Sequence, residues 1–389
     1  MNKKSITVLG KLIALIAVAL TVMIVSSGIS VHADNGKKVR VTTAKELKAA
    51  IKNADVGTII LRTEAYIDIT IKSAKGAKTK ELIVDAKNAN ITNKAVFKSI
   101  NVISANSYTE NVSGNKISLS DNYMQDGFTV AKKKKVASLK LYSDYGSFDN
   151  CYTLRKGAKI GEVSLEYSGG IDPVTSTYNK SKRVLKIKCS DDTVRTYTIK
   201  LDKSGRIISF DCESDWPEAD HDETYTYDSN GNIVKIVGHD NESGTYTTEI
   251  TYSGNLMIKN ANNGTYSSGA YTYEYDKKGR LIHREYTGVD SIDGQTFKYG
   301  SAEDFEYDKK GRRIYDRLDD PETGSFYENS YTYNSKGYRT EVYNNMSGGE
   351  NIWKYEYDEA GNLIKSIYTS EGFSNTYEFE YDEFGVRFS

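Results

Sequence analysis

Alternating aromatic and polar residues dominate the C-terminal half of the chain. The clearest stretch reads Tyr-Glu-Tyr-Asp-Glu-Ala-Gly-Asn-Leu over 355–363. Side chains alternate between the faces of an extended strand, so the two tyrosines share one face. The aspartate side chain favours a turn by hydrogen-bonding to the backbone just after it. The glycine adopts the positive φ that the turn requires, and the leucine begins the return strand. Each such stretch therefore predicts one β-hairpin.

This stretch recurs from about position 205 to residue 389. Successive turn glycines are separated by 23 to 32 residues, which is typical of repeat architectures. A lone hairpin is only marginally stable in water, so the copies are expected to pair with one another as an antiparallel array. The predicted structural turn residues are Asp202, Gly205, Asp228, Gly231, Asp276, Gly279, Asp308, Gly311, Asn334, Gly337, Asp358, Gly361, Asp382 and Gly385.

Short apolar and β-branched runs, separated by Asn, Gly, Lys and Ser, fill residues 58–167. Strands at such close, irregular spacing favour a β-solenoid over a sandwich. Before them, Thr43 and Glu46 form a capping box, and Leu47, Ala50 and Ile51 fall on one helical face. The pattern thus predicts an all-β chain, in which a short N-terminal solenoid capped by one helix precedes the hairpins.

Two resemblances follow from these patterns. Residues 201–389 resemble the YD repeat of the RHS family, Tyr-Asp-x-x-Gly-Asn/Arg-Leu, whose members are bacterial surface, carbohydrate-binding and wall-associated proteins and toxin shells. This resemblance implies an extended β-ribbon with an extracellular role. Arg313 and Arg339 replace the apolar residue of the pattern, and 287–304 lengthen one loop. Residues 39–170 resemble the start of pectate-lyase-like right-handed β-helices, where a helix caps the first coil.

The first 33 residues predict a secretory signal. They contain an early lysine pair, no acidic residue, an apolar run over 12–25 and Val-His-Ala at 31–33. The expected organisation is a signal peptide (1–33), a basic solenoid-like domain (34–182) and an acidic, Tyr-rich hairpin domain (183–389). No transmembrane segment is expected after cleavage, and the localisation predicted is extracellular, associated with a bacterial cell surface.

Charge divides the chain at the same region. Residues 34–200 carry a net charge of +13 and residues 201–389 a net charge of −17. The run Lys132 to Lys135 could meet an anionic polymer or be a solvated loop. Nucleic acid is not an expected partner, because the chain is predicted to be exported and its sequence contains no nucleic-acid recognition motif. A cell-wall polymer or glycan is the expected partner, and protein partners remain open.

Tyrosines are the candidate binding residues, since 22 of the 31 lie in residues 201–389. Exposed aromatic rings stack on sugar rings, whereas the plainer interpretation is cross-strand packing on a half-buried sheet. The candidate aromatic ladder consists of Tyr225, Tyr227, Tyr273, Tyr275, Tyr307, Tyr331, Tyr333, Tyr355, Tyr357 and Tyr381.

Metal, cofactor and catalytic functions find little support. The turn aspartates stand about 25 residues apart, too far for one calcium site. The acidic stretch 211–223 is a better calcium candidate, but a solvated acidic loop is the favoured interpretation. Three histidines remain after position 33, none at metal spacing, and no hydrolase or protease motif occurs. We expect a surface binding protein and no enzyme. The alternatives are a scaffold assembling through hairpin edges and, less favoured, a polysaccharide-active enzyme on the N-terminal coils.

Overall fold

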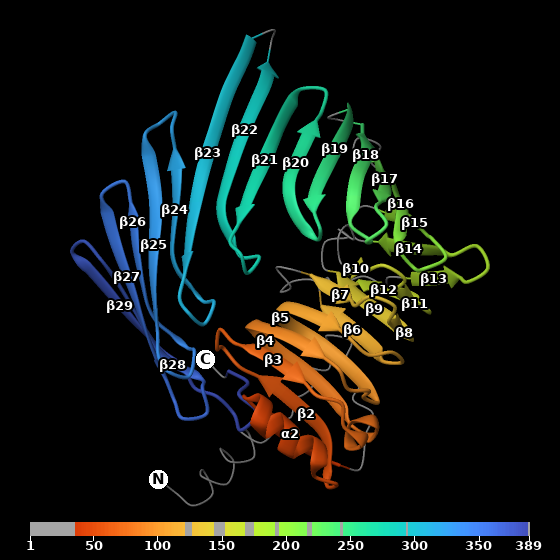
Figure 1. Cartoon of the computed structure of the whole chain (residues 1–389), viewed down its shortest axis with the longest axis vertical. Helices are drawn as coiled ribbons and strands as arrows, with labels where there is room; N and C mark the ends of the chain where they lie inside the picture. The colour runs from red at the N-terminus through yellow and green to blue at the C-terminus, as the bar shows by residue number, and fades with distance from the viewer. Residues whose placement is uncertain are drawn as a thin grey trace, which may run out of the picture.

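The computed structural model describes residues 36–120, 127–143, 152–167, 175–190, 194–215, 220–241, 244–292 and 295–387. Within these ranges the protein is almost wholly β (Figure 1). A parallel solenoid forms the N-terminal part, and one antiparallel sheet forms the rest. The predicted all-β fold class is confirmed. The predicted signal segment, 1–33, lies outside the described residues.

No helix in the described part of the chain is long and apolar enough to cross a membrane.

The solenoid is made of parallel strands that stack coil upon coil on three sides. The first side has the order β1-β2-β4-β5-β6-β9-β12, β3, β7 and β10 lie on the second side with the far ends of β4 and β5, and β8 pairs with β11 on the third. The strands are β1 (Lys37–Val41), β2 (Val56–Arg62), β3 (Asp68–Ile71), β4 (Glu81–Asn93), β5 (Ser99–Glu110), β6 (Lys116–Ser120), β7 (Phe128–Val130), β8 (Lys135–Val136), β9 (Ser138–Ser143), β10 (Tyr152–Leu154), β11 (Lys159–Ile160) and β12 (Val163–Tyr167).

Aliphatic side chains form a column through the solenoid interior, because the coils stack in register. Ile59, Leu82 and Ile100 are partners on three adjacent strands, and each is at most 1% exposed. Ile117 and Leu139 continue the column. Each buried aliphatic side chain contributes about 1.5–3 kcal/mol relative to an exposed one. The column therefore holds successive coils together.

Helix α2 (Ala44–Lys52) closes the N-terminal end of the solenoid (Figure 1). The Thr43 hydroxyl accepts a hydrogen bond from the Glu46 N–H at 3.2 Å, which satisfies one of the free donors of the first turn. Leu47, Ala50 and Ile51, the three residues expected on one face, are the buried residues of the helix. The helix covers apolar surface that an open coil would expose. A single-turn helix, η1 (Lys75–Thr79), lies between β3 and β4.

One carboxyl group is enclosed inside the solenoid. Glu110 is fully buried, and the side-chain amides of Asn93 and Asn115 donate to its oxygens at 3.0 and 3.2 Å. The Tyr108 hydroxyl also donates to Glu110, at 3.3 Å. Burial raises the pKa of Glu110 to about 7, although these hydrogen bonds oppose the shift. The solenoid core thus contains a group that titrates near neutral pH.

The antiparallel sheet is a meander of seventeen strands in which every strand pairs with its neighbours in sequence. Its strands are β13 (Thr175–Asn179), β14 (Val184–Ser190), β15 (Val194–Leu201), β16 (Ile207–Ser214), β17 (His221–Tyr227), β18 (Ile233–Asp240), β19 (Gly244–Ser253), β20 (Leu256–Asn263), β21 (Ser267–Tyr275), β22 (Leu281–Ile292), β23 (Gln295–Tyr307), β24 (Arg313–Asp320), β25 (Ser325–Tyr333), β26 (Arg339–Met346), β27 (Gly349–Tyr357), β28 (Leu363–Ser370) and β29 (Phe373–Glu378).

Two segments differ from their sequence interpretation. Thr175–Asn179, which the sequence places in the solenoid-like domain before the boundary at 182, pairs with β14 as the first strand of this sheet. The architecture therefore changes between β12 and β13. Residues 287–304, expected as a lengthened loop, extend β22 and β23 to 12 and 13 residues, because cross-strand partners continue to Ile292 and Gln295.

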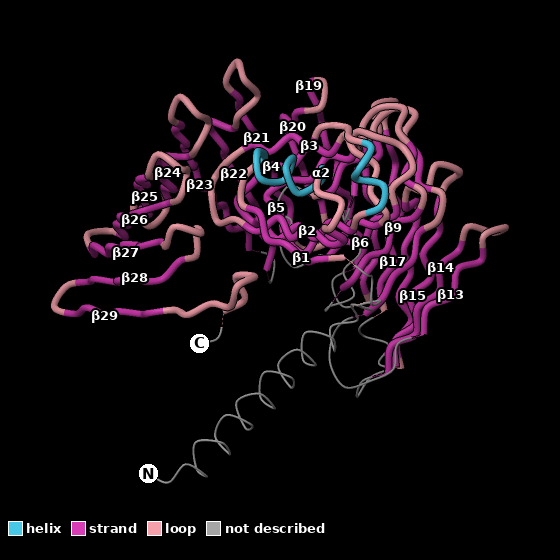
Figure 2. Tube along the Cα trace, turned by 90° about the horizontal axis from the view of Figure 1, so that it is seen from below, coloured by secondary structure: helices cyan, strands magenta, loops and turns pink. Residues whose placement is uncertain are grey.

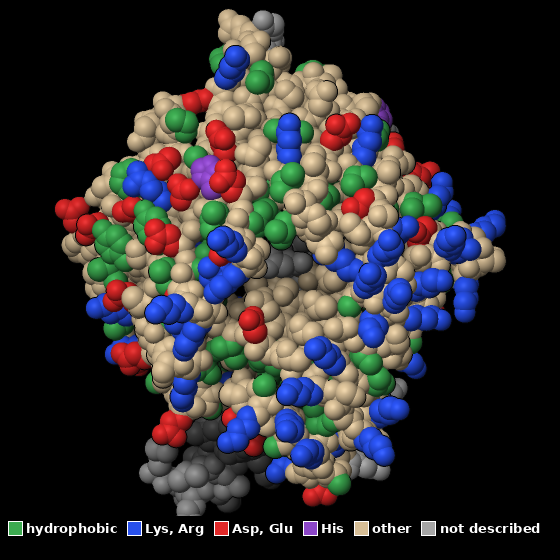
Figure 3. Space-filling view, viewed as in Figure 1, with side chains coloured by type: hydrophobic (Ala, Val, Ile, Leu, Met, Phe, Trp, Pro, Cys, Tyr) green, Lys and Arg blue, Asp and Glu red, His purple; other side chains and the backbone are tan. Residues whose placement is uncertain are grey.

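The sheet curls, and both of its ends rest on the solenoid (Figure 2). At one end the Ile160 N–H donates to the Ser204 carbonyl at 2.8 Å, beside the first turn. At the other end the Tyr66 N–H donates to the Gly337 carbonyl at 2.9 Å, and Arg62 donates to the Phe384 carbonyl at 3.1 Å. The space-filling surface is hollowed between the middle hairpins and the solenoid (Figure 3). The sheet therefore bridges the solenoid from its last coil to its first.

Arg339 joins the two parts at the closing end. Its guanidinium lies 4.5 Å from the ring centroid of Tyr66, on the solenoid, and 4.5 Å from that of Tyr331, on the sheet. The Tyr66 ring also meets Tyr333 edge-on, with centroids 5.2 Å apart. A cation held between aromatic faces is attracted by both ring quadrupoles. This contact explains why an arginine stands where the repeat pattern has an apolar residue.

We expect Tyr66 and Arg339 to be energetically coupled. In a double-mutant cycle with Tyr66→Leu and Arg339→Met, urea unfolding should give a coupling energy of about 1 kcal/mol in favour of the native pair. Arg284, which lies over Tyr271 within the sheet, supplies the matched control. A cycle of Tyr66→Leu with Arg284→Met should be additive, and additivity of the first cycle would contradict a contact across the junction.

Candidate binding face

Strand alternation gives the antiparallel sheet two different faces. The face that we call the tyrosine face carries the motif tyrosines of β17, β21, β23, β25 and β27. Their direct cross-strand partners are apolar, serine or arginine residues such as Leu281, Val342 and Arg284. The opposite face, called the charged face, carries cross-strand ion pairs. These pairs are Lys235–Glu249, His283–Asp304, Arg317–Glu328 and Lys354–Glu341. The charged face is a solvated surface, so the tyrosine face is the candidate site.

Each motif turn is built in the same way. In the turn that starts at Asp276, the carboxylate accepts the backbone N–H groups of Lys278 and Arg280 at 2.8 and 3.0 Å. Gly279 has φ +77° and donates its N–H to the Asp276 carbonyl at 2.9 Å. The backbone N–H and the guanidinium of Arg280 lower the pKa of Asp276 to about 2. The Asp276 carboxylate therefore stabilises its own turn, and its role is structural.

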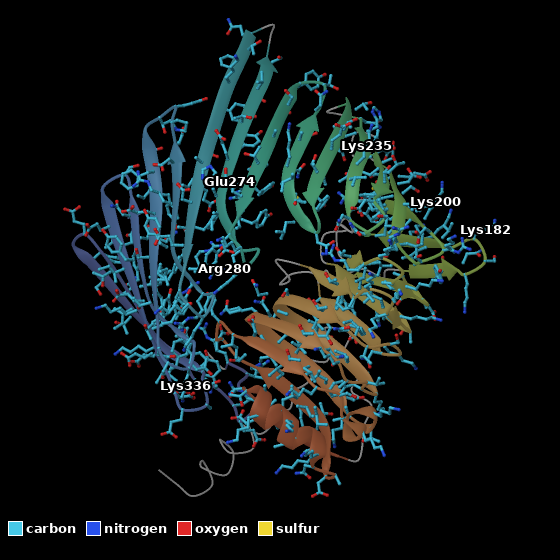
Figure 4. The ribbon with its side chains drawn as sticks, viewed as in Figure 1. Lys182, Lys200, Lys235, Glu274, Arg280 and Lys336 are labelled. Carbon is cyan, nitrogen blue, oxygen red and sulfur yellow. The ribbon has the colours of Figure 1, made fainter. Side chains whose placement is uncertain are left out.

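The residue after each turn glycine connects one repeat to the next. Arg280, labelled at the end of its hairpin in Figure 4, lies 4.7 Å from the ring centroid of Tyr307 and donates to the Asp308 carbonyl at 3.3 Å. Arg312 repeats both contacts one hairpin later, with Tyr333 and Asn334. The Asn/Arg position of the pattern therefore links successive turns.

The second tyrosine of each motif has a structural role. The hydroxyls of Tyr227, Tyr275 and Tyr333 donate to backbone carbonyls of the preceding hairpin, at 2.6, 2.8 and 2.7 Å. Tyr357 stacks on Tyr338 with ring centroids 4.8 Å apart. The Tyr307 ring lies beneath Arg280, whereas Tyr381 is placed by an isolated backbone β-bridge to Arg387. These rings lock neighbouring hairpins together.

The first tyrosine of each motif lies two residues before the second and points to the same face of the sheet. Tyr225 is 7% exposed and donates to Glu223. Tyr331 donates to the Asp316 carboxylate at 2.7 Å, and burial together with this bond raises its pKa above the usual range. Tyr273 stacks on Tyr271, and Tyr355 is half-buried. The geometry thus assigns most motif tyrosines to packing.

A row of amide groups crosses the tyrosine face further from the turns. Asp316, Asn329, Asn344 and Asn351 are cross-strand partners on β24 to β27. Asn329 donates to Asp316 at 2.8 Å, Asn344 to Asn329 at 3.2 Å and Asn351 to Asn344 at 3.2 Å. The Tyr368 hydroxyl donates to Asn351 at 2.6 Å and ends the row. The bonds all run in one direction toward the carboxylate.

Aromatic and apolar side chains flank this amide row on both sides. On the turn side, Trp353 and Tyr368 pack with ring centroids 4.5 Å apart. On the far side, Leu318, Tyr327 and Met346 are cross-strand partners and are 39%, 39% and 56% exposed. A largely buried polar row therefore lies between the half-buried rings of Trp353 and Tyr368 and an exposed apolar row, across β24 to β28. We call this region the amide–aromatic surface.

The sequence carried one signal for these residues. In Trp353 and Tyr355, as in Tyr271 and Tyr273, the alternation by two extends beyond the motif toward the N-terminus. Following it would have placed Trp353, Tyr271 and Asn329 on the tyrosine face. Their mutual contacts depend on the register between repeats, which is not visible in one copy of the motif.

The other candidate sites lie apart from this surface. Among the described residues, no group of three or more His, Cys, Asp or Glu side chains is placed to hold a metal ion. The acidic stretch 211–223 was predicted to be a solvated loop, but its ends belong to the paired strands β16 and β17, because Asp211 and Asp222 are cross-strand partners. Residues 216–219 lie outside the described part, and Asp220 accepts the Ser214 N–H at 2.6 Å. The Lys132 to Lys135 run lies on the third side of the solenoid, at the start of β8.

The fold and this surface define an all-β chain in which a parallel solenoid supports a curled sheet of repeated hairpins. No family model and no curated protein matches the chain. Solved structures that match include a porin-like protein from Bacteroides uniformis ATCC 8492, with 13% identity, a TM-score of 0.25, and coverage of 50% of this chain and 91% of that chain.

TcdB2-TccC3-TEV matches with 14% identity and a TM-score of 0.25, over 55% of this chain and 14% of that chain. TcdB2-TccC3-Cdc42 matches with 13% identity and a TM-score of 0.22, over 54% and 16%. Scores this low carry no argument about function, which is inferred below from the geometry of the chain itself.

Proposed function

We propose that the protein is a secreted, cell-surface binding protein that holds a carbohydrate chain along the amide–aromatic surface. The observation that carries this proposal is the row of four hydrogen-bonded polar side chains that runs beside one exposed apolar row. The rings of Trp353 and Tyr368, on the other side of the polar row, are half-buried.

Asp316, Asn329 and Asn344 are buried and hold the row in place. Asn351, at the half-buried end of the row, has an amide that offers both a donor and an acceptor to sugar hydroxyls. Aromatic faces provide apolar area together with a polar edge, which suits the two faces of a sugar ring.

The curvature of the protein supports the same role. Because both ends of the sheet rest on the solenoid, the strands that carry the amide row are held in a fixed register. A surface built on a rigid sheet loses little conformational freedom when it binds. The predicted signal at 1–33 supports an extracellular location. This proposal has no catalytic step.

The test is a glycan array probed with purified protein and two matched variants. Trp353→Ala removes a ring of the amide–aromatic surface, whereas Tyr343→Ala removes a ring of the charged face on the adjacent strand β26. We expect Trp353→Ala to weaken binding tenfold or more, equivalent to about 1.4 kcal/mol, and Tyr343→Ala to change it less than threefold. Thermal melting of both variants controls for folding.

No glycan signal from the parent protein, or equal loss in the two variants, would contradict a carbohydrate site on this surface.

A further inference from the structure

The third side of the solenoid gathers positive charge to an unusual degree. This side consists of the segments 72–80, 94–98, 111–116, 131–137 and 155–162, which connect each coil to the next. Together they contain fourteen Lys or Arg residues and a single acidic residue, Glu162. Figure 3 shows Lys and Arg side chains gathered over the solenoid. We call this surface the lysine side.

Three of these basic groups have structural partners. Lys80 is buried and donates to the Asn53 and Val56 carbonyls, Lys98 lies 3.5 Å from Glu81, and Arg155 donates to Asn232. Within the described part of the chain, none of the other eleven makes an ion pair. They are Lys72, Lys75, Lys78, Lys94, Lys116, Lys132, Lys133, Lys134, Lys135, Lys156 and Lys159.

Coil stacking aligns the lysines of segments 131–137 and 155–162 with one another. Lys135 and Lys159 are parallel-strand partners. The Lys133 N–H donates to the Lys156 carbonyl at 3.1 Å, and the Lys159 N–H donates to the Lys134 carbonyl at 2.9 Å. Neighbouring strands lie about 4.8 Å apart, so these lysines form a column that runs across the two coils. Like charges at this spacing repel one another, and a bound counter-charge relieves that repulsion.

The composition of the column indicates what it binds. Lysine is a compact point charge without the planar fork by which arginine reads individual groups. Phe97 is the one aromatic residue of these segments and is 3% exposed, so the surface offers no platform on which bases could stack. Such a column suits a linear chain of regularly spaced anionic groups that lacks bases.

We propose that the lysine side is a second binding site, separate from the amide–aromatic surface, which holds a linear phosphate polymer without bases along the solenoid axis. The curled sheet leaves it accessible, since Lys133, Lys135, Lys156 and Lys159 are all exposed in the folded chain. Binding depends on the combined charge of several closely spaced lysines, so it is strongly sensitive to salt.

The experiment measures fluorescence anisotropy of labelled poly(glycerol phosphate) with purified protein at 50 and 200 mM NaCl. With about five phosphates engaged, log K falls by about 0.7 per phosphate for each unit of log salt, so affinity drops roughly 100-fold between these conditions. The variant K133Q/K135Q/K156Q/K159Q should bind at least tenfold more weakly at 50 mM and show a smaller salt slope.

The matched control is K259Q/K277Q/K278Q/K309Q, which removes four exposed lysines of the sheet. It should change affinity less than threefold. An arginine version of the first variant keeps the charge and should retain binding, which separates charge loss from misfolding. Absence of binding at 50 mM, or equal loss in both glutamine variants, would overturn the proposal. Equal or tighter binding of single-stranded DNA with the same charge would also overturn it.

Trp353→Ala should leave phosphate-polymer binding unchanged, so failure of one proposed site is distinguishable from failure of the other.

Discussion

Gly231→Ala is expected to separate the sheet from the last coil of the solenoid. Gly231 has φ +91°, and a Cβ there would lie 1.8 Å from the Leu154 carbonyl oxygen. That contact would involve a backbone atom, which cannot rotate away as a side chain would. The variant must therefore combine a strained turn with a displaced junction, and we expect it to lose about 3–5 kcal/mol of unfolding free energy.

Gly311→Ala is the matched control for backbone strain. Gly311 occupies the same place in its turn with φ +90°, and nothing lies within 4 Å of the position that a Cβ would take there. This variant should lose only about 1–2 kcal/mol, the cost of a left-handed conformation for alanine. Urea unfolding measures both losses, and limited proteolysis detects opening of the junction. Equal losses in the two variants would show that the junction contributes nothing.

The second large effect concerns Glu110. Its pKa is about 7 in the folded protein and 4.5 for an ordinary carboxyl group, so the fold favours the protonated form. The resulting stabilisation is fully present below pH 4.5 and is lost as pH rises through 7, amounting to about 3 kcal/mol. Glu110→Gln mimics the protonated acid and removes this dependence.

The measurement is urea unfolding of the parent and of Glu110→Gln between pH 4.5 and 8. The difference between their unfolding free energies should shift by about 3 kcal/mol in favour of the variant as pH rises. Other titrating groups cancel in this difference. Glu162→Gln, at an exposed position of the same solenoid, is the control and should give a constant difference. A constant difference for Glu110→Gln as well would contradict the burial of an ionisable carboxyl group.

The hairpin repeats were predictable because their information is local. Asp276 and Gly279 specify a turn through contacts within five residues, and the same chemistry recurs in each copy. The capping helix was likewise encoded in the capping box and in the face formed by Leu47, Ala50 and Ile51. Turns and helices of this kind can be predicted from a single short stretch of sequence.

The amide row and the buried carboxyl group were not predictable in the same way. Asn329, Asn344 and Asn351 come from three strands, and only the register of the sheet aligns them. The sequence around Glu110 gives no sign of its role, since nothing nearby shows that Asn93, one coil earlier, stacks against it. Arg339 looked like a departure from the repeat and is instead a contact between the two parts.

The closure of the sheet on the first coils has a consequence for the order of folding. Nearly all contacts of the meander join strands adjacent in sequence, and the solenoid stacks one coil on the next. The closing bonds are different: Arg40 reaches the Ala360 carbonyl and Arg62 the Phe384 carbonyl, across 320 and 322 residues.

Contacts of such sequence separation carry the largest loop-closure entropy and form after local structure is in place. A chain emerging N-terminus first would complete its coils and then its hairpins one by one. The bonds from Arg40 to the Ala360 carbonyl and from Arg62 to the Phe384 carbonyl would form last, when the final hairpins reach the first coil.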